Sequence, residues 1–284
     1  MASVKRIFNF AVCFMKKFEE NELIYFANAL TYRLLLAIFP FIIFLMSLLG
    51  FFDFEVDDYI KRIAVSMPVD VRKILFVFLE EVVYSRNVSL LSISLLLSVF
   101  SASSGFNYLI KGINKAFDIE DERNFIKKRA ISILLVFVFS ILITASLILF
   151  IFCDAIEEVL IDFIGTGDII KYVFGMTGYI INAVALFIIL IVIFKISVCK
   201  KIKFRCLAPG TLIVVFGWLM MSKIFNIYVN NFSKISVIYG SLGGVFILLV
   251  WLNILSVLIL AGNQINAMLM KRKRKRVIKN NSEV

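Results

Sequence analysis

The feature that most constrains this fold is a series of six apolar runs without a single charged residue. A helix needs about 20 apolar residues to cross a bilayer. The chain is 61% hydrophobic and 18% charged, more apolar than one water-soluble core can bury. We therefore expect an all-α polytopic integral membrane protein with six transmembrane helices. The six runs cover residues 34–52, 88–110, 130–153, 172–194, 207–222 and 235–270.

Two of the runs have unusual lengths. Residues 207–222 would extend only about 24 Å as a helix, so we expect this span to continue through Lys223 toward Val229. Residues 235–270 would extend about 54 Å, which is too long for one straight crossing. We expect Ile235–Gly244, rich in Gly and Ser, to form a turn or re-entrant segment on the outer side. The span itself is then about Val245–Leu269.

The basic residues predict the orientation. With six crossings both termini lie on one side, and 23 of the 31 Lys and Arg residues fall on that side. The positive-inside rule then places both termini of this multi-pass protein in the cytoplasm. We expect one six-span domain over residues 1–270, followed by a basic cytoplasmic tail over residues 271–284.

Two further segments have the pattern of amphipathic helices. In residues 4–20, apolar side chains recur at helical spacing among four basic ones, which favours a helix on the inner leaflet. Packing on other cytoplasmic segments is the alternative. Residues 53–87 also contain an apolar stripe and would lie on the outer leaflet or cap the bundle.

The composition argues against several kinds of chemistry. The chain has no His, and its four Cys form no CxxC pair, so no metal site, cofactor or disulfide framework is expected. A metal-dependent ribonuclease would need a cluster of His and carboxylates, and direct ATP hydrolysis would need a P-loop. We therefore expect a protein that is not an enzyme.

Four stretches resemble the YihY/virulence factor BrkB family of bacterial inner-membrane proteins. They begin at residues 30, 101, 208 and 239, and read LTYRLLLAIFP, SASSGFNYLIKGINKAFDIEDERNFIKKR, APGTL and YGSLGGVFILLVWLNILSVLILAGNQINA. The resemblance covers roughly residues 20–270. It implies six spans with cytoplasmic termini and an unsettled biochemistry. Family members carry an older ribonuclease BN label, and some are linked to envelope lipid handling.

The resemblance also assigns individual positions. Gln264 stands where members commonly carry Glu, and Ala37 stands where many have Ser, so proton coupling or a polar role there is in question. The matching positions are Tyr32, Pro40, Asn114, Arg123, Pro209, Gly210, Tyr239, Gly240, Gly243, Trp251 and Gly262.

Some side chains could line a solute pathway. Arg33 is either a snorkelling anchor or an anion contact, and Lys223 is either an intramembrane functional charge or a second snorkelling residue. Small residues of the second span, such as Ser101 and Gly105, favour close helix packing over cavity lining. The last span holds four amides that form either a pathway or interhelical hydrogen bonds: Asn253, Asn263, Gln264 and Asn266.

The basic tail KRKRKR indicates binding to anionic lipid headgroups rather than to nucleic acid. A homo-oligomer is compatible with the sequence. The charged connection after the second span is explained by salt bridges or helix–lipid contacts.

Two hypotheses for function follow. The first is a transporter or flippase-like protein for a lipid or another amphipathic or anionic solute, with a cavity between the first, second, fifth and sixth spans. The second is a structural or scaffolding protein of the envelope.

Overall fold

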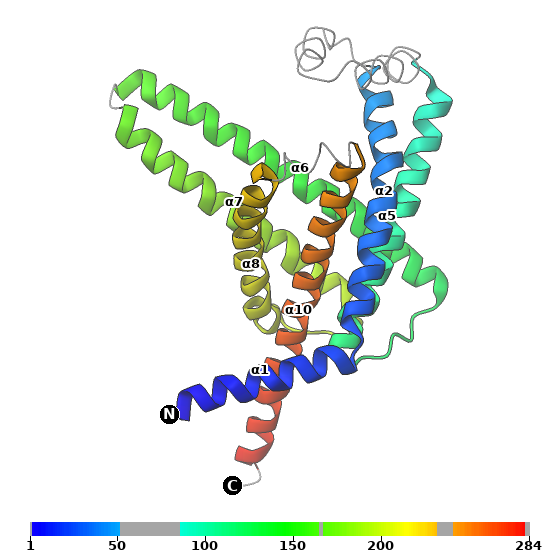
Figure 1. The fold of residues 1–284 in the computed structure, drawn as a ribbon, viewed down its shortest axis with the longest axis vertical. Helices are drawn as coiled ribbons and strands as arrows, with labels where there is room; N and C mark the ends of the chain where they lie inside the picture. The colour runs from blue at the N-terminus through cyan, green and yellow to red at the C-terminus, as the bar shows by residue number, and fades with distance from the viewer. Residues whose placement is uncertain (1, 52–85, 165–166, 232–240, 282–284) are drawn as a thin grey trace. The chain divides into compact units, whose positions relative to one another are not determined.

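The computed structural model describes residues 2–51, 86–164, 167–231 and 241–281, and every regular element within them is an α-helix (Figure 1). This confirms the predicted all-helical class for that part of the chain. The helices are α1 (Ala2–Glu20), α2 (Leu23–Leu49), α5 (Val88–Ala116), α6 (Phe125–Ile164), α7 (Gly167–Ser197), α8 (Phe204–Asn231) and α10 (Ser241–Asn281).

Six of these helices are long and apolar enough to cross a membrane, as the sequence predicted. The first crossing starts at Leu23 rather than at Leu34, because the single charge of Arg33 interrupts the apolar run but not the helix. Helix α8 continues through Lys223 to Asn231, as expected from its short apolar run. The spanning segments are Leu23–Leu48, Val88–Ala116, Phe125–Ser146, Ile180–Ser197, Phe204–Phe225 and Gly244–Lys273.

Some predictions concern residues outside the described ranges. The expected outer amphipathic segment, residues 53–87, lies outside the described ranges except for residues 86 and 87. Residues 235–240 of the expected turn or re-entrant segment also lie outside them. Helix α10 begins at Ser241, so the last four residues of that segment are helical. The orientation of the termini stays a prediction.

The chain divides into two compact units, residues 1–32 with 103–284 and residues 33–102. In the second unit, Ser94 and Ser98 are buried, and their hydroxyls donate to the carbonyls of Leu91 and Leu95 in the same helix. Pro40 lies inside α2, where it removes one backbone donor. The first unit contains the candidate site.

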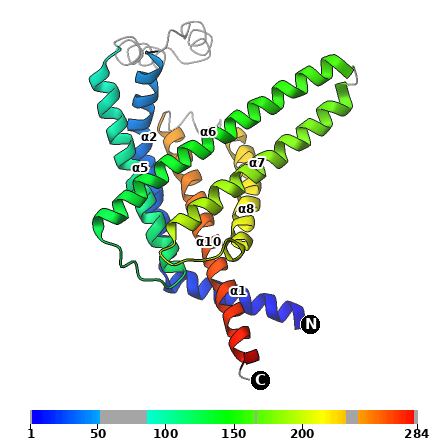
Figure 2. The same ribbon diagram turned by 180° about the vertical axis from the view of Figure 1, so that it is seen from behind.

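Within the first unit, α6 and α7 run side by side, α7 also packs on α8, and α8 packs on α10 (Figures 1 and 2). The contact between α8 and α10 depends on two glycines. A Cβ on Gly210 would lie 2.1 Å from the carbonyl oxygen of Gly262, and a Cβ on Gly262 would lie 2.2 Å from Val214 Cγ2. Only glycine at both positions lets the two backbones approach this closely.

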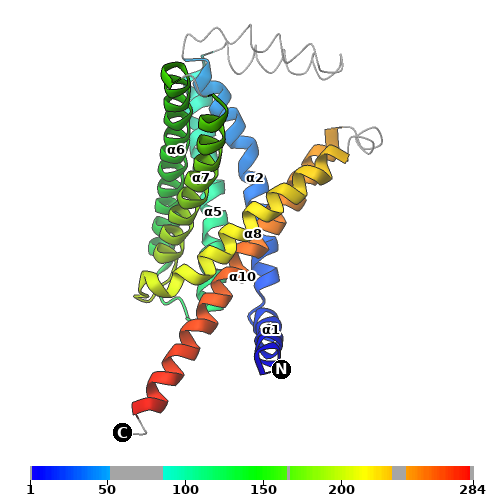
Figure 3. The same ribbon diagram turned by 90° about the vertical axis from the view of Figure 1, so that its left-hand side faces the viewer.

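Helix α1 packs against α10 near the end of the chain (Figure 3). The guanidinium of Arg272 lies 5.5 Å from the centre of the Phe10 ring, within cation–π distance. The apolar side chains of Phe8 and Met15 are 66% and 70% exposed. The described residues leave these two side chains uncovered, and the position of α1 on the inner leaflet stays a prediction. We call the end of the unit where α1 meets α10 the terminal end.

Candidate functional site

A cavity of about 590 Å³ lies where the α5–α6 connector meets the α7–α8 connector. The four membrane-spanning segments that these connectors join end or begin at Ala116, Phe125, Ser197 and Phe204. The cavity is therefore at the depth where apolar helix gives way to polar chain. Its lining residues are Asp118, Ile119, Glu120, Glu122, Arg123, Lys127, Cys199 and Lys200. We call it the connector cavity.

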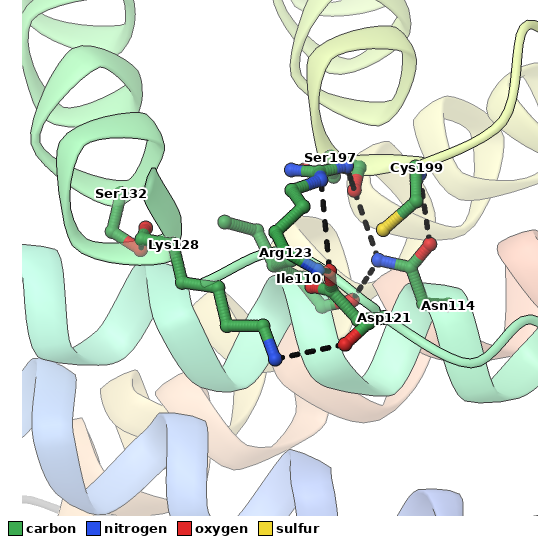
Figure 4. Close-up of polar contacts among 8 residues, drawn as sticks. All are labelled: Ile110, Asn114, Asp121, Arg123, Lys128, Ser132, Ser197 and Cys199. Atoms are coloured by element: carbon green, nitrogen blue, oxygen red, sulfur yellow. Dashed lines mark hydrogen bonds and ion pairs between the residues drawn. The ribbon is translucent and has the colours of Figure 1, made fainter. Parts of the chain in front are cut away.

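Asn114, which is 2% exposed at the end of α5, holds the two connectors together (Figure 4). Its Nδ2 donates to the carbonyls of Ile110 at 2.8 Å and Ser197 at 3.0 Å. Its Oδ1 accepts from the backbone N–H of Cys199 at 2.9 Å. One amide thus satisfies backbone groups at the end of α7 that the helix itself leaves unpaired.

Arg123 contributes a second link to the same point. Its Nη2 donates to the carbonyl of Ser197 at 3.3 Å, where the helix dipole of α7 favours a positive charge. Its Nε lies 3.6 Å from Asp121 Oδ1, and both side chains are largely buried, at 13% and 11% exposure. Its Nη1 is buried and has no hydrogen-bond partner in the described part of the chain. The guanidinium of this lining residue therefore keeps one donor atom that the described residues do not use.

The Cys199 thiol is held in its protonated form. Partial burial raises the pKa of this thiol above its usual range, and a hydrogen bond to the Asp121 carboxylate raises it further. The nearby Arg123 charge acts in the opposite direction but does not prevail. Lys128 Nζ donates to the Asp121 carbonyl at 2.9 Å and so fixes this part of the connector. The arrangement does not activate the thiol as a nucleophile.

The end of α10 is tied to the wall of the cavity. Lys271, the first residue of the basic tail, forms an ion pair with Asp118. Asp118 adopts a left-handed backbone conformation with a φ of 52°, directly after α5. The connector cavity therefore lies at the terminal end of the unit.

Polar side chains occur at intervals along α10 from its middle toward this end, facing more than one neighbouring element. We call Asn253, Ser256, Asn263, Gln264 and Asn266 the α10 polar seam. The last four are between 0% and 1% exposed. From Asn253 to Asn266 the seam extends about 20 Å along the helix.

Several seam residues bond to neighbouring helices. Asn253 Nδ2 donates to Asn28 Oδ1 at 2.8 Å. Ser256 Oγ lies 3.2 Å from Thr31 Oγ1, although Thr31 can give its only proton either to Ser256 or to the carbonyl of Ala27. Near the terminal end, Gln264 Oε1 accepts from Asn21 Nδ2 at 3.1 Å in the turn between α1 and α2.

Two fully buried amide atoms of the seam have no partner among the described residues. Asn263 donates to the carbonyl of Ile259 at 2.9 Å, but its Oδ1 is unpaired. Asn266 Oδ1 accepts from the Gly210 N–H at 2.6 Å, while its Nδ2 is unpaired. Buried polar atoms are normally bonded to protein or to water, so these two atoms are exceptions among the described residues.

The structure brings together only some of the residues that the sequence singled out. Asn114 and Arg123 meet at the connector cavity, and Gly210 and Gly262 lie at the α8–α10 contact. Pro209 lies inside α8, where its ring opens the local hydrogen-bond ladder next to the Gly210 N–H. Trp251 packs on Trp218 at 6.4 Å and on Phe225 at 4.6 Å, measured between ring centroids.

Other candidates lie elsewhere. Tyr32 is 57% exposed, Lys223 is exposed on α8, and Arg33 is half-buried in the second unit. Tyr239 and Gly240 lie outside the described residues, Gly243 is in the first turn of α10, and Gly105 is buried in α5. The connector cavity involves the ends of the second to fifth spans rather than the predicted set of spans. Apart from Arg123, its lining was not proposed from sequence, although the charged run after Asn114 was a signal for it.

Comparison with known proteins matches this chain to one family. Residues 14–283 match the sequence profile of the family described as "Virulence factor BrkB". The chain is 32% identical over 245 residues to a protein of Bacillus subtilis (strain 168) named a ribonuclease-like protein, YfkH, covering 86% of this chain and 89% of the relative. It is 24% identical over 270 residues to the UPF0761 membrane protein NTHI0384 of Haemophilus influenzae, covering 90% and 93%. No solved structure matches the chain.

Proposed function

Because the chain belongs to the virulence factor BrkB family of multi-pass membrane proteins, we propose that it carries an amphipathic or anionic solute across the membrane. The observation that supports this proposal most is the α10 polar seam with its two unpaired amide atoms. Polar side chains inside a membrane helix are costly, and they commonly mark the route of a solute or ion.

The position of the seam fits such a route. It begins at Asn253, well inside the segment Gly244–Lys273, and approaches the terminal end, where Lys271 reaches the connector cavity. A solute could exchange its hydration for amide contacts along the seam and for charged side chains in the cavity. We place the cavity on the cytoplasmic side of the inner membrane, since the connectors that form it are among the most basic parts of the chain.

Translocation in reconstituted vesicles tests this function. Lipids with a fluorescent headgroup label are placed in both leaflets, and an impermeant reductant added outside quenches only the outer ones. In vesicles with wild-type protein, we expect labelled lipids of the inner leaflet to reach the outer leaflet and be quenched faster than in protein-free vesicles. Asn263→Leu should slow this exchange about tenfold, because it removes an unpaired seam acceptor. Lys223→Ala serves as the control with an unchanged rate, since Lys223 is exposed and off the seam.

A structural role in the envelope is the second candidate. The direct backbone contact between Gly210 and Gly262 favours it, because such a close contact suits a rigid bundle. It predicts the same exchange rate with and without protein. We propose no ribonuclease activity for this chain, and a wild-type preparation that cleaves RNA above a protein-free blank would contradict that proposal.

A further inference from the structure

We infer that the connector cavity binds a zwitterionic head group that carries a phosphate and a primary amine. This inference rests on the proposed function and deepens it by naming the chemical class of the solute. Three observations support it: the charges of the lining, the fixed guanidinium of Arg123 and the depth of the cavity in the membrane.

The lining carries equal numbers of acids and bases. Six of its eight residues carry a formal charge: Asp118, Glu120 and Glu122 are acidic, and Arg123, Lys127 and Lys200 are basic. A simple anion would meet three carboxylates, and a simple cation would meet three positive charges. A ligand with both signs at a short separation can be attracted by both sets, which is how charge complementarity gives specificity.

The basic half suits a phosphate. Arg123 is fixed by Ser197 and Asp121 through Nη2 and Nε, so its orientation is set before a ligand arrives, while Nη1 is buried and has no partner among the described residues. A guanidinium held in this way binds phosphate oxygens with defined geometry. Lys127 and Lys200, both exposed on the lining, can add charge around the same group.

The acidic half suits an amine. Asp118 is already paired with Lys271, but Glu120 and Glu122 are exposed and form no ion pair with the described residues. Their carboxylates can accept hydrogen bonds from an ammonium group. The cavity of about 590 Å³ falls within the usual range for small-ligand sites, roughly 300–1,000 Å³.

The depth of the cavity matches that of lipid head groups. The four spanning segments around it stop or start within a few residues of its lining, at Ala116, Phe125, Ser197 and Phe204. Head groups of phospholipids lie in this zone between hydrocarbon and water. The same chemistry occurs in a free phosphate–amine solute, so the test includes both sources.

Calorimetric titration of the full-length protein in detergent tests the inference. The soluble probes are glycerophosphoethanolamine, glycerol phosphate and ethanolamine, and the lipid probe is a short-chain phosphatidylethanolamine. We expect glycerophosphoethanolamine to bind about tenfold more tightly than glycerol phosphate or ethanolamine, because only it uses both halves of the lining. Equal affinity for the soluble and acylated forms would identify the head group as sufficient, and binding of the lipid alone would identify a lipid ligand.

Substitutions in the lining test the basic half and the acidic half of the cavity separately. Arg123→Lys should lower the affinity for glycerophosphoethanolamine about tenfold, since a lysine lacks the planar guanidinium that binds phosphate oxygens. The double variant Glu120→Gln/Glu122→Gln should abolish the preference over glycerol phosphate. It keeps the test valid if Arg123→Lys unfolds, because both acids are exposed and outside the Asn114 network. Lys200→Gln should weaken binding, while the neighbouring Lys201→Gln, outside the lining, should not.

The inference is overturned if neither form of phosphoethanolamine binds, or if glycerol phosphate or ethanolamine alone binds equally well. It is also overturned if the double acid variant keeps the preference. Binding without translocation would leave this site intact and reject the proposed function. Translocation without binding would reject the site and keep the function.

Discussion

The contact between α8 and α10 allows a sharp prediction for Gly210→Ala. The new Cβ would lie 2.1 Å from the Gly262 carbonyl oxygen and 2.6 Å from Asn266 Cγ, whereas real Cβ atoms rarely approach a heavy atom within 3.0 Å. The first obstacle is backbone, which cannot rotate away as a side chain can. The two helices must therefore separate by about 1 Å, and the 2.6 Å hydrogen bond from Gly210 N–H to Asn266 must lengthen.

The separation of the helices and the longer hydrogen bond both lower the free energy of unfolding. Overpacking of a close contact destabilises by about 1–3 kcal/mol. An interhelical hydrogen bond in a membrane protein contributes about 0.6 kcal/mol and at most about 1.7 kcal/mol. Together they predict a loss of about 2–4 kcal/mol, which for a chain of 284 residues lowers the melting temperature by roughly 3–7 °C.

The assay is thermal unfolding of the purified protein in detergent, followed by the fraction that remains monodisperse. Gly244→Ala is the matched control on α10, because a Cβ there meets nothing within 4 Å. Alanine is a better helix former than glycine by about 1 kcal/mol, so the control should melt at the same temperature or slightly higher. If Gly210→Ala melted together with Gly244→Ala, the direct contact between the two helices would be refuted.

Two further predictions concern the connectors. Asn114→Ala should destabilise the protein by about 2–3 kcal/mol, because it leaves the Cys199 N–H without its partner and removes one of two hydrogen bonds to the Ser197 carbonyl. Thermal unfolding checks this, with the exposed Asn9→Ala as a neutral control. In a variant whose only cysteine is Cys199, Asp121→Asn should speed alkylation severalfold near pH 8. Loss of the Asp121 carboxylate lowers the pKa of the Cys199 thiol and so raises its thiolate fraction at that pH. An unchanged alkylation rate would contradict the contact between Asp121 and Cys199.

Much of the fold could be predicted from sequence because membrane spans follow from local apolarity alone. The continuation of α8 past Lys223 was predicted from length, since a helix must cross the hydrocarbon whether or not one charge interrupts it. The start of the first span was placed too late for the opposite reason. Arg33 was treated as a boundary, although a single long side chain can lie within a continuous helix.

The site was less predictable because it depends on contacts between distant segments. The amides of the last span were recognised as needing partners, but the sequence could not tell that Gln264 meets Asn21 or that Asn266 meets Gly210. The charged connector was assigned to salt bridges or lipid contacts. Its fold around Asn114, 83 residues from Ser197 in the chain, is set by tertiary packing and has no local periodicity that predicts it.

A solute pathway along α10 requires the α10 polar seam to open to water during function. In a variant without the native cysteines, Ser256→Cys places a thiol in the seam, and Val214→Cys places one at the α8–α10 contact beside Gly262. Both native side chains are buried, at 1% and 0% exposure. In reconstituted vesicles a water-soluble thiol reagent should modify Ser256→Cys at least about tenfold faster than Val214→Cys. Equal rates, or no reaction at Ser256→Cys, would contradict a solute pathway along this helix.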